Sequence, residues 1–75
     1  MIEILDLWYQ YEPEISNIAI IYYEDINGKE WELAHIKINN EIEQEDLYNY
    51  CLEIANEMGY QLVGYLELEE SQKWI

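Results

Sequence analysis

The sequence is poor in positive charge, since its 75 residues contain three Lys and no Arg. Against these stand 17 Asp and Glu residues, which give a formal net charge of −14 at pH 7. A polyanion of this density is repelled by nucleic acids and by anionic membranes, so we expect neither to be a direct ligand. The composition instead predicts a partner with a basic protein surface.

Cysteine is nearly absent as well, because Cys51 is the only one in the chain. A single cysteine excludes an internal disulfide bond, which is typical of a reducing compartment such as the cytoplasm. Residues 1–14 lack the basic start and uninterrupted apolar run of a signal peptide, and no stretch is long enough to span a bilayer. We therefore expect a soluble cytoplasmic protein.

Phenylalanine is missing, although eight Tyr and three Trp bring the aromatic fraction to 15%. Tyr and Trp combine an apolar ring with a polar group, which suits half-buried positions in a thin domain and binding interfaces alike. The hydrophobic fraction of 51% is sufficient for one small core, so the high charge does not indicate disorder. We predict a single domain over residues 1–75.

The first segment, residues 1–11, is predicted to be a strand. Alternate positions from Leu5 to Tyr11 are apolar or aromatic, as in a half-buried strand. A short helix is the alternative, because apolar residues three and four positions apart also occur here. Pro13 ends this segment or marks the turn after it.

A β-hairpin is predicted next. Residues 17–24 are β-branched and aromatic, and Asn27-Gly28 has the composition of a two-residue type I′ turn. Such a turn pairs Asp25 with Glu30 and so places like charges opposite each other. One face of the hairpin then carries Ile18, Ile20, Tyr22, Trp31, Leu33 and His35, and the other carries Ala19, Ile21, Tyr23, Ala34, Ile36 and Ile38. Both faces are apolar at the base, so we expect a helix to cover one, and a partner is one way to cover the other.

A helix is predicted after Asn40, a good N-cap residue that Glu43 follows at the capping-box spacing. Gly59 marks its end. Its predicted buried stripe is Leu47, Cys51, Ile54 and Met58, flanked by Tyr50 and Ala55. Residues 60–67 follow as a last strand, which Gly64 weakens or interrupts with a bulge. The order β-β-β-α-β predicts an α+β fold, with a small antiparallel or mixed sheet and one helix packed on a face.

The sequence offers no catalytic motif. His35 is the only histidine, and neither a second histidine nor a suitably placed cysteine supports a metal site or a general base. Cys51 lies on the apolar helix stripe and is predicted to be a small buried side chain. In the segment DINGKE, Gly28 comes fourth, whereas an EF-hand loop needs glycine in sixth position. We expect no enzyme activity, no cofactor and no metal site.

Carboxylates gather in three groups along the predicted elements. The tip group consists of Glu24, Asp25, Glu30 and Glu32. The helix group consists of Asp46, Glu53 and Glu57, which share a narrow sector beside the buried stripe, with rises of about 10 and 6 Å between successive members. The third group is Glu67, Glu69 and Glu70. Because phosphates rise about 3.4 Å apiece along a DNA strand, such rows are compatible with nucleic-acid mimicry, although any acidic helix produces similar ones.

The tip group and the helix group are our predicted partner-binding residues. Their carboxylates would replace phosphate contacts, and Tyr23, beside the tip, would pack at the centre of the interface. Electrostatic steering would recruit the basic partner. Acidic residues that only increase solubility would not require so few Lys and Arg.

In size, charge, aromatic content and α+β pattern, the whole chain resembles the small acidic DNA-mimic inhibitors made by phages and mobile elements. These include many anti-CRISPR proteins and the uracil-DNA glycosylase inhibitor. The resemblance involves no family-specific motif, so no functional residue is carried over from it. It implies an inhibitor that blocks a host nuclease or another DNA-processing enzyme, such as a CRISPR effector, by direct binding.

Two other functions are compatible with the sequence. One is a small assembly module, for example a homodimer that hides the second apolar face of the sheet. The other is an antidote that neutralises a basic toxin, which has the same electrostatics and differs in its partner. Measurements of size at several concentrations, with and without partners, separate the first from an inhibitor, and gene neighbourhood separates the second.

Overall fold

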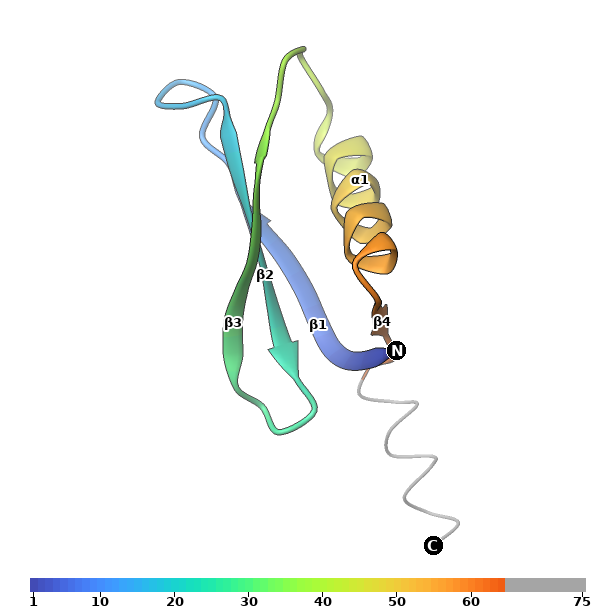
Figure 1. Cartoon of the computed structure of the whole chain (residues 1–75). Helices are drawn as coiled ribbons and strands as arrows, with labels where there is room; N and C mark the ends of the chain where they lie inside the picture. Colours follow the sequence, from blue (N-terminus) through green and yellow to red (C-terminus); the bar gives the residue numbers. More distant parts are fainter. Residues whose placement is uncertain (65–75) are drawn as a thin grey trace, which may run out of the picture.

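The computed structural model describes residues 1–64, which form a four-stranded mixed sheet with one helix packed on it (Figure 1). The elements in chain order are β1 (Ile2–Gln10), β2 (Ile18–Asp25), β3 (Glu30–Lys37), α1 (Gln44–Glu57) and β4 (Tyr60–Leu62). The predicted α+β fold and its order β-β-β-α-β are confirmed. The first segment is a strand, so the helical alternative is wrong.

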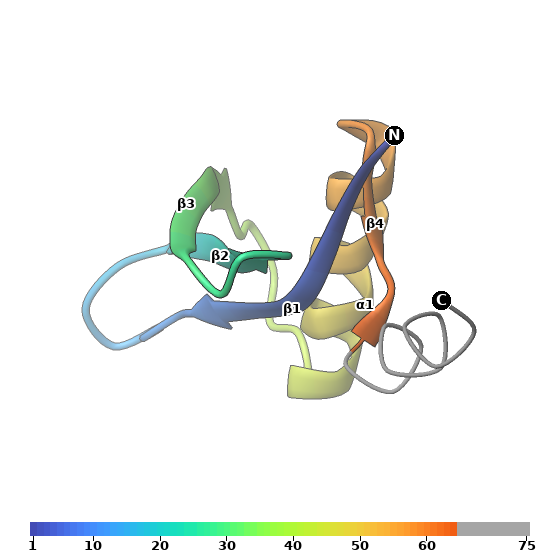
Figure 2. The same ribbon diagram turned by 90° about the horizontal axis from the view of Figure 1, so that it is seen from below.

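The strands lie in the order β3-β2-β1-β4. Both β1 and β3 are antiparallel to β2, whereas β4 is parallel to β1 and pairs only with residues 2–4 of it. Figure 2 shows α1 running beside β1 and β4 on one side of the sheet. The predicted last strand is shorter than expected, and its residues from 65 onward lie outside the described part of the chain. Gly64 follows the strand with a φ of 72°.

The loop between β2 and β3 is not the predicted type I′ turn. That turn needs positive φ at both central residues, but among residues 1–64 only glycines have positive φ, so Asn27 does not adopt it. The loop has three residues, 26–28. The Asp25 N–H donates to the Lys29 carbonyl at 2.8 Å, and the Gly28 N–H donates to the Asp25 carbonyl at 2.9 Å. Gly28, with a φ of 82°, supplies the left-handed residue that such a loop requires.

The hairpin register shifts by one residue halfway along its length. In the base, Ile21 pairs with Ala34, which agrees with the predicted faces. Beyond it, Tyr22 pairs with Glu32, so Leu33 is an extra residue in β3 and forms a β-bulge. Leu33 is half-buried and packs against the core, whereas the prediction placed it on the opposite face.

The bulge changes which residues meet at the hairpin tip. Glu24, and not Asp25, lies opposite Glu30. Trp31 pairs with Tyr23 and therefore shares its face, whereas the predicted register placed the two on opposite faces. The like-charged pair that the sequence suggested is present, but one residue earlier in β2.

The helix begins later than predicted. Its N-cap is Glu43, which makes no side-chain capping bond, so the expected capping box at Asn40 does not form. The chain instead stays non-helical over residues 38–43, where Ile38 is buried and its N–H donates to the Asn17 carbonyl at 2.7 Å. The C-terminal end is as predicted, since Gly59 follows the C-cap residue with a φ of 92°.

The core lies between α1 and the sheet. Its buried residues are Ile4, Leu7, Ala19, Ile21, Ile38, Leu47, Cys51 and Ala55. On α1 the buried stripe recurs every four residues and includes Ala55, whereas the predicted member Ile54 is half-buried and Met58 is 49% exposed. Small side chains at Ala19, Cys51 and Ala55 leave room for the helix to approach the sheet closely.

Candidate partner-binding surface

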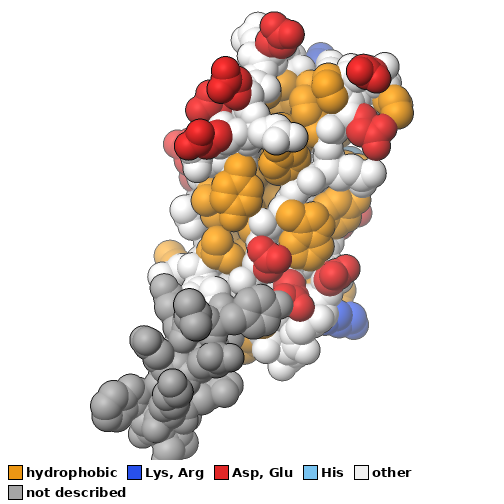
Figure 3. All heavy atoms as spheres, turned by 180° about the vertical axis from the view of Figure 1, so that it is seen from behind, with side chains coloured by type: hydrophobic (Ala, Val, Ile, Leu, Met, Phe, Trp, Pro, Cys, Tyr) orange, Lys and Arg blue, Asp and Glu red, His pale blue; other side chains and the backbone are white. Residues whose placement is uncertain are grey.

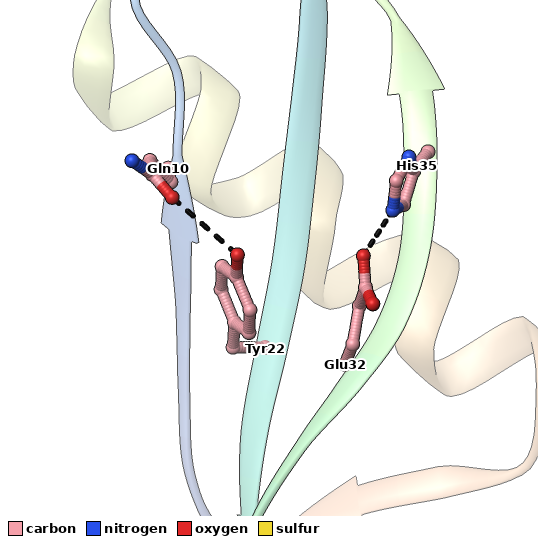
Figure 4. A network of polar contacts seen from close by, with 4 residues as sticks. All are labelled: Gln10, Tyr22, Glu32 and His35. Atoms are coloured by element: carbon pink, nitrogen blue, oxygen red, sulfur yellow. Dashed lines mark hydrogen bonds and ion pairs between the residues drawn. The ribbon is translucent and has the colours of Figure 1, made fainter.

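The face of the sheet opposite α1, which we call the outer face, is not covered by any element within residues 1–64. Its residues follow from the strand register, because residues paired across neighbouring antiparallel strands point to the same side. The register gives four rows across the sheet: Ile18 and Lys37; Gln10, Ile20 and His35; Trp8, Tyr22 and Glu32; and Asp6, Glu24 and Glu30. Figure 4 shows Gln10, Tyr22, Glu32 and His35 on this face, with α1 behind the strands.

Two aromatic rings lie at the centre of the outer face. Trp8 and Tyr22 are stacked, with ring centroids 6.0 Å apart and an interplanar angle of 16°. Both are half-buried by their neighbours within the sheet. The Tyr22 hydroxyl donates a long hydrogen bond, 3.4 Å, to Oε1 of Gln10 (Figure 4). The pair is therefore held in place in the free protein and keeps ring surface open to a ligand.

Carboxylates occupy one end of the outer face. Three members of the predicted tip group, Glu24, Glu30 and Glu32, lie there. Asp6 joins them, because it pairs with Glu24 across β1 and β2. The sequence reasoning missed Asp6, although its position two residues before Trp8 in an alternating strand places it on the same face.

His35 and Glu32 form an ion pair on the outer face when the imidazole is protonated (Figure 4). The His35 side chain is 57% exposed and the Glu32 side chain is 50% exposed. The bulge brings them together, because it places residues three apart in β3 on the same side. His35 is thus a surface residue, as the sequence indicated.

Asp25 is separated from the rest of the tip group by the hairpin register. Its Oδ1 accepts hydrogen bonds from the Asn27 and Lys29 N–H groups at 2.9 and 3.0 Å. Its Oδ2 accepts one from the indole Nε1 of Trp31 at 2.8 Å. The indole and backbone donors hold the pKa of Asp25 below its ordinary value. The Asp25 carboxylate therefore stabilises the loop, and both of its oxygens already accept hydrogen bonds in the free protein.

Tyr23 also serves the fold. It packs against the core, and its ring lies 5.1 Å from that of Tyr60, centroid to centroid. Burial raises its pKa, with a further contribution from the hydrogen bond with Tyr60. The exposed aromatic residue at the tip is instead Trp31, which is 43% exposed and has Lys29 Nζ 4.5 Å from its ring centroid. The sequence reasoning did not select Trp31, and the predicted type I′ register placed it on the face opposite Tyr23.

The helix group lies on the other side of the molecule. Asp46, Glu53 and Glu57 are exposed on α1. At about 100° per residue they lie roughly 80–180° around the helix from the buried stripe, and so face away from the sheet. The sheet itself separates them from the outer face. A single flat partner surface therefore cannot contact both the helix group and the carboxylates of the outer face.

Carboxylates are accessible all around the described part of the chain, where no charged or polar residue is buried. Seen from behind, hydrophobic side chains form a band through the middle of the molecule, and Asp and Glu side chains lie around it (Figure 3). A hollow lined by Gln10, Glu12, Ile15, Ser16, Ile18 and Ile20 continues the outer face toward the β1–β2 connection. Ile15 is 77% exposed there.

Cys51 is fully buried, as predicted, and burial raises the pKa of its thiol, which keeps it protonated and unreactive. Residues 1–64 contain no group of three or more His, Cys, Asp or Glu side chains arranged to hold a metal ion. Within the same residues, no helix combines the length and the apolar character needed to cross a lipid bilayer.

Comparison with known proteins assigns no family to this chain. No family model matches the sequence, and no match was found among curated proteins or solved structures.

Proposed function

We propose that this protein is an inhibitor that mimics the charge of a nucleic acid and occupies the basic nucleic-acid-binding surface of an enzyme. One observation carries the proposal. The chain has 17 Asp and Glu residues against three Lys, and none of the carboxylates within residues 1–64 is buried. The described part of the fold tolerates this self-repulsion without placing any of its own carboxylates in the interior.

The proposed mechanism has two steps. Long-range attraction steers the acidic domain to a basic channel and raises the association rate above that of a neutral pair. Short-range contacts of aromatic side chains then make the complex specific, because a few residues dominate the binding energy of typical interfaces and Trp and Tyr are enriched among them. Trp8 and Tyr22 on the outer face are described aromatic side chains placed for this purpose, and Trp31 is a further exposed ring at the tip, on the other side of the sheet.

The resemblance to small acidic inhibitors of phages and mobile elements supports a target within the class of DNA-processing enzymes. We propose a host defence nuclease, with a CRISPR effector as the first candidate, and hence an anti-CRISPR function in the host cytoplasm. The inhibitor has no catalytic role in this proposal. It competes with nucleic acid for the basic surface.

The proposal is tested by capture followed by inhibition. The immobilised protein is incubated with lysate from cells that carry a CRISPR system, and bound proteins are eluted first with duplex DNA and then with salt. We expect a nucleic-acid enzyme in the DNA eluate. Its purified activity should fall with added inhibitor and recover as the DNA substrate concentration rises. Absence of such an enzyme, or inhibition that excess DNA does not relieve, would contradict the proposal.

A homodimer is the second candidate, and the uncovered outer face is the observation that favours it. A two-fold dimer through this face would cover Trp8 and Ile20, but it would also bring the carboxylates of both copies into one interface. Sedimentation at several protein concentrations tests it. A stable dimer at low ionic strength would favour the assembly module, whereas a monomer that binds only a basic protein would favour the inhibitor.

A further inference from the structure

The outer face differs from the solvent-exposed face of an ordinary antiparallel sheet. Such a face is normally polar along each strand, with apolar residues restricted to the core side. Here the two middle rows contain Ile20, Trp8 and Tyr22, the end row beside them contains Ile18, and no element within residues 1–64 lies over these side chains. Ile15 extends the apolar surface beyond the strands. An apolar and aromatic centre of this kind is typical of an interaction surface.

The charge around this centre indicates what covers it. Asp6, Glu24 and Glu30 form a complete row of carboxylates across β1, β2 and β3, and Glu32 lies in the aromatic row itself. The opposite end of the face carries Lys37 and the His35 side chain that contacts Glu32. Negative charge therefore borders the aromatic pair on two sides, and the complementary partner is cationic beside the rings and apolar beyond them.

A second copy of the chain fits this surface poorly. It would bring the same carboxylates and a net charge of −14 to the interface. The described lysines and, when it is protonated, His35 supply few cations, and of these Lys29 already lies over Trp31 at the tip while His35 contacts Glu32. Like charges across an interface oppose association. The occupant is thus a different protein with positive charge.

Arginine is the cation that best matches the two rings and the carboxylates. Its planar guanidinium stacks on aromatic faces and at the same time donates paired hydrogen bonds to a carboxylate. A lysine ammonium makes neither the planar stack nor the paired bond. The protein itself contains no arginine, so this group must come from the partner.

We propose that the outer face is the partner-binding surface and that it binds an arginine-bearing basic protein segment, whose guanidinium stacks on the Trp8–Tyr22 pair and bonds to Glu32 or Glu30. This inference builds on the proposed function and replaces its predicted interface with a single side of the molecule. The helix group, which faces away from the sheet, is outside that interface. Apolar side chains of the same segment occupy the hollow beside Ile18 and Ile20.

The test uses two peptides of equal length and charge, one with arginines and one with lysines, each with two apolar residues beside the cations. Either peptide is titrated into the full-length isotope-labelled protein at about 0.15 M salt, where surface attraction is largely screened beyond about 8 Å. We expect amide and indole shifts at Trp8, Tyr22 and Glu32. The arginine peptide should bind about tenfold more tightly than the lysine peptide.

Matched variants separate this surface from bulk charge. The double substitution Glu30→Gln with Glu32→Gln removes two charges from the outer face, and Glu53→Gln with Glu57→Gln removes two from α1. We expect the first to weaken arginine-peptide binding about tenfold and the second less than about twofold. Trp8→Ile keeps a strand-forming apolar residue and removes the ring. It should abolish the preference for arginine over lysine.

Several outcomes would overturn the inference. These are equal losses from the two double variants, shifts confined to α1, equal binding of the two peptides, concentration-dependent dimers, and contacts of residues 65–75 with Trp8 in the free protein. The same variants, assayed for inhibition of a captured enzyme, separate the two proposals. Inhibition lost only in the α1 double variant would reject this surface and keep the function. Arginine binding at the outer face without any nucleic-acid enzyme as target would keep this surface and reject the proposed function.

Discussion

The carboxylate of Asp25 and the indole of Trp31 are hydrogen bonded at the hairpin tip, with Nε1 of Trp31 2.8 Å from Oδ2 of Asp25. The second carboxylate oxygen accepts two backbone N–H groups of the loop. Asp25 therefore acts as a cap for the three-residue loop, and an aromatic ring shields one side of it. Acidic residues next to each other in sequence have different functions here, because only some of them are used by the fold.

Loss of this hydrogen bond should loosen the loop while the hairpin base stays intact. Trp31→Phe keeps an aromatic ring for Lys29 to cover and removes the indole donor. We expect amide hydrogen exchange at Asn27 and Lys29 to accelerate by about threefold, because a single partly exposed hydrogen bond contributes little. Exchange at Ile21, in the buried base, is the internal control. Equal acceleration at Ile21 would mean that the tip and the base open together.

Acid should weaken the tip for the same reason. The Trp31 indole is the main cause that lowers the pKa of Asp25 below its ordinary value of 3.8, followed by the Lys29 N–H. The ionised form is favoured in the folded state, so this contribution is present above the ordinary value and is lost as the pH falls through the lowered pKa. Carboxyl chemical shifts measured against pH report this pKa directly. Trp31→Phe should move it upward, and an unchanged value would contradict the assignment.

Charge reversal at Glu30 should stabilise the protein. Glu24 and Glu30 lie directly opposite each other, so Glu30→Lys replaces a repulsive cross-strand pair with an attractive one and contributes about 0.2–1 kcal/mol. Glu14→Lys makes the same change of net charge in the exposed β1–β2 connection. Thermal unfolding at low and moderate salt should show a larger increase in melting temperature for Glu30→Lys than for Glu14→Lys. The difference between the two variants should shrink as the salt concentration rises.

The unmodified protein provides the companion measurement for that experiment. Moderate salt should raise its melting temperature, because screening reduces the repulsion among its carboxylates. Equal gains from Glu30→Lys and Glu14→Lys would show that only the total charge matters and that the cross-strand pair does not.

Truncation of a core side chain should lower the free energy of unfolding far more than truncation of a side chain at the tip. Ile21 is fully buried between β1, β3 and α1, so Ile21→Ala should lower the free energy of unfolding by about 2–4 kcal/mol. Ile26, in the loop, is 55% exposed, and Ile26→Ala should change it by less than about 0.5 kcal/mol. Urea denaturation of both variants measures the difference. Similar costs would mean that the core is not where the structure places it.

Gly59 tests the end of the helix. Its φ is 92°, and a Cβ added there would meet no atom within 4 Å, so the cost of Gly59→Ala is conformational and not steric. We expect a loss of about 1 kcal/mol. Gly59→Asn should lose less, since asparagine tolerates the left-handed conformation better than alanine. An alanine variant as stable as the parent would show that the chain leaves α1 in another way.

Local patterns predicted most of the fold. The apolar alternation of β1, the β-branched run of β2 and the glycine after α1 all correspond to elements of the structure. The errors arose where tertiary contacts outweighed local preference. Asn27-Gly28 favours a two-residue turn in isolation, but the bulge at Leu33 and the Asp25 cap select a three-residue loop. Burial of Ile38 delays the helix past the good capping residue Asn40.

The candidate surface was harder to predict than the fold. The sequence identified acidic residues by proximity, whereas the register divides them among faces. It places Asp6 beside Glu24 and removes Asp25 and Tyr23 from the outer face. A one-residue shift in pairing moves every later side chain of a strand to the other face of the sheet. Residues grouped by their position in the sequence are therefore assigned to the wrong face beyond a bulge. The third acidic group lies outside the described residues.

The parallel pairing of β1 with β4 has a consequence for how the chain folds as it is synthesised. Residues 2–4 leave the ribosome almost sixty residues before their partner strand, residues 60–62. The hairpin of β2 and β3 can form from local contacts in the meantime, whereas completion of the sheet must wait for the distant segment. During that interval the edge of β1 near Ile4 is open. Abundant negative charge on the nascent chain would then discourage its pairing with another copy.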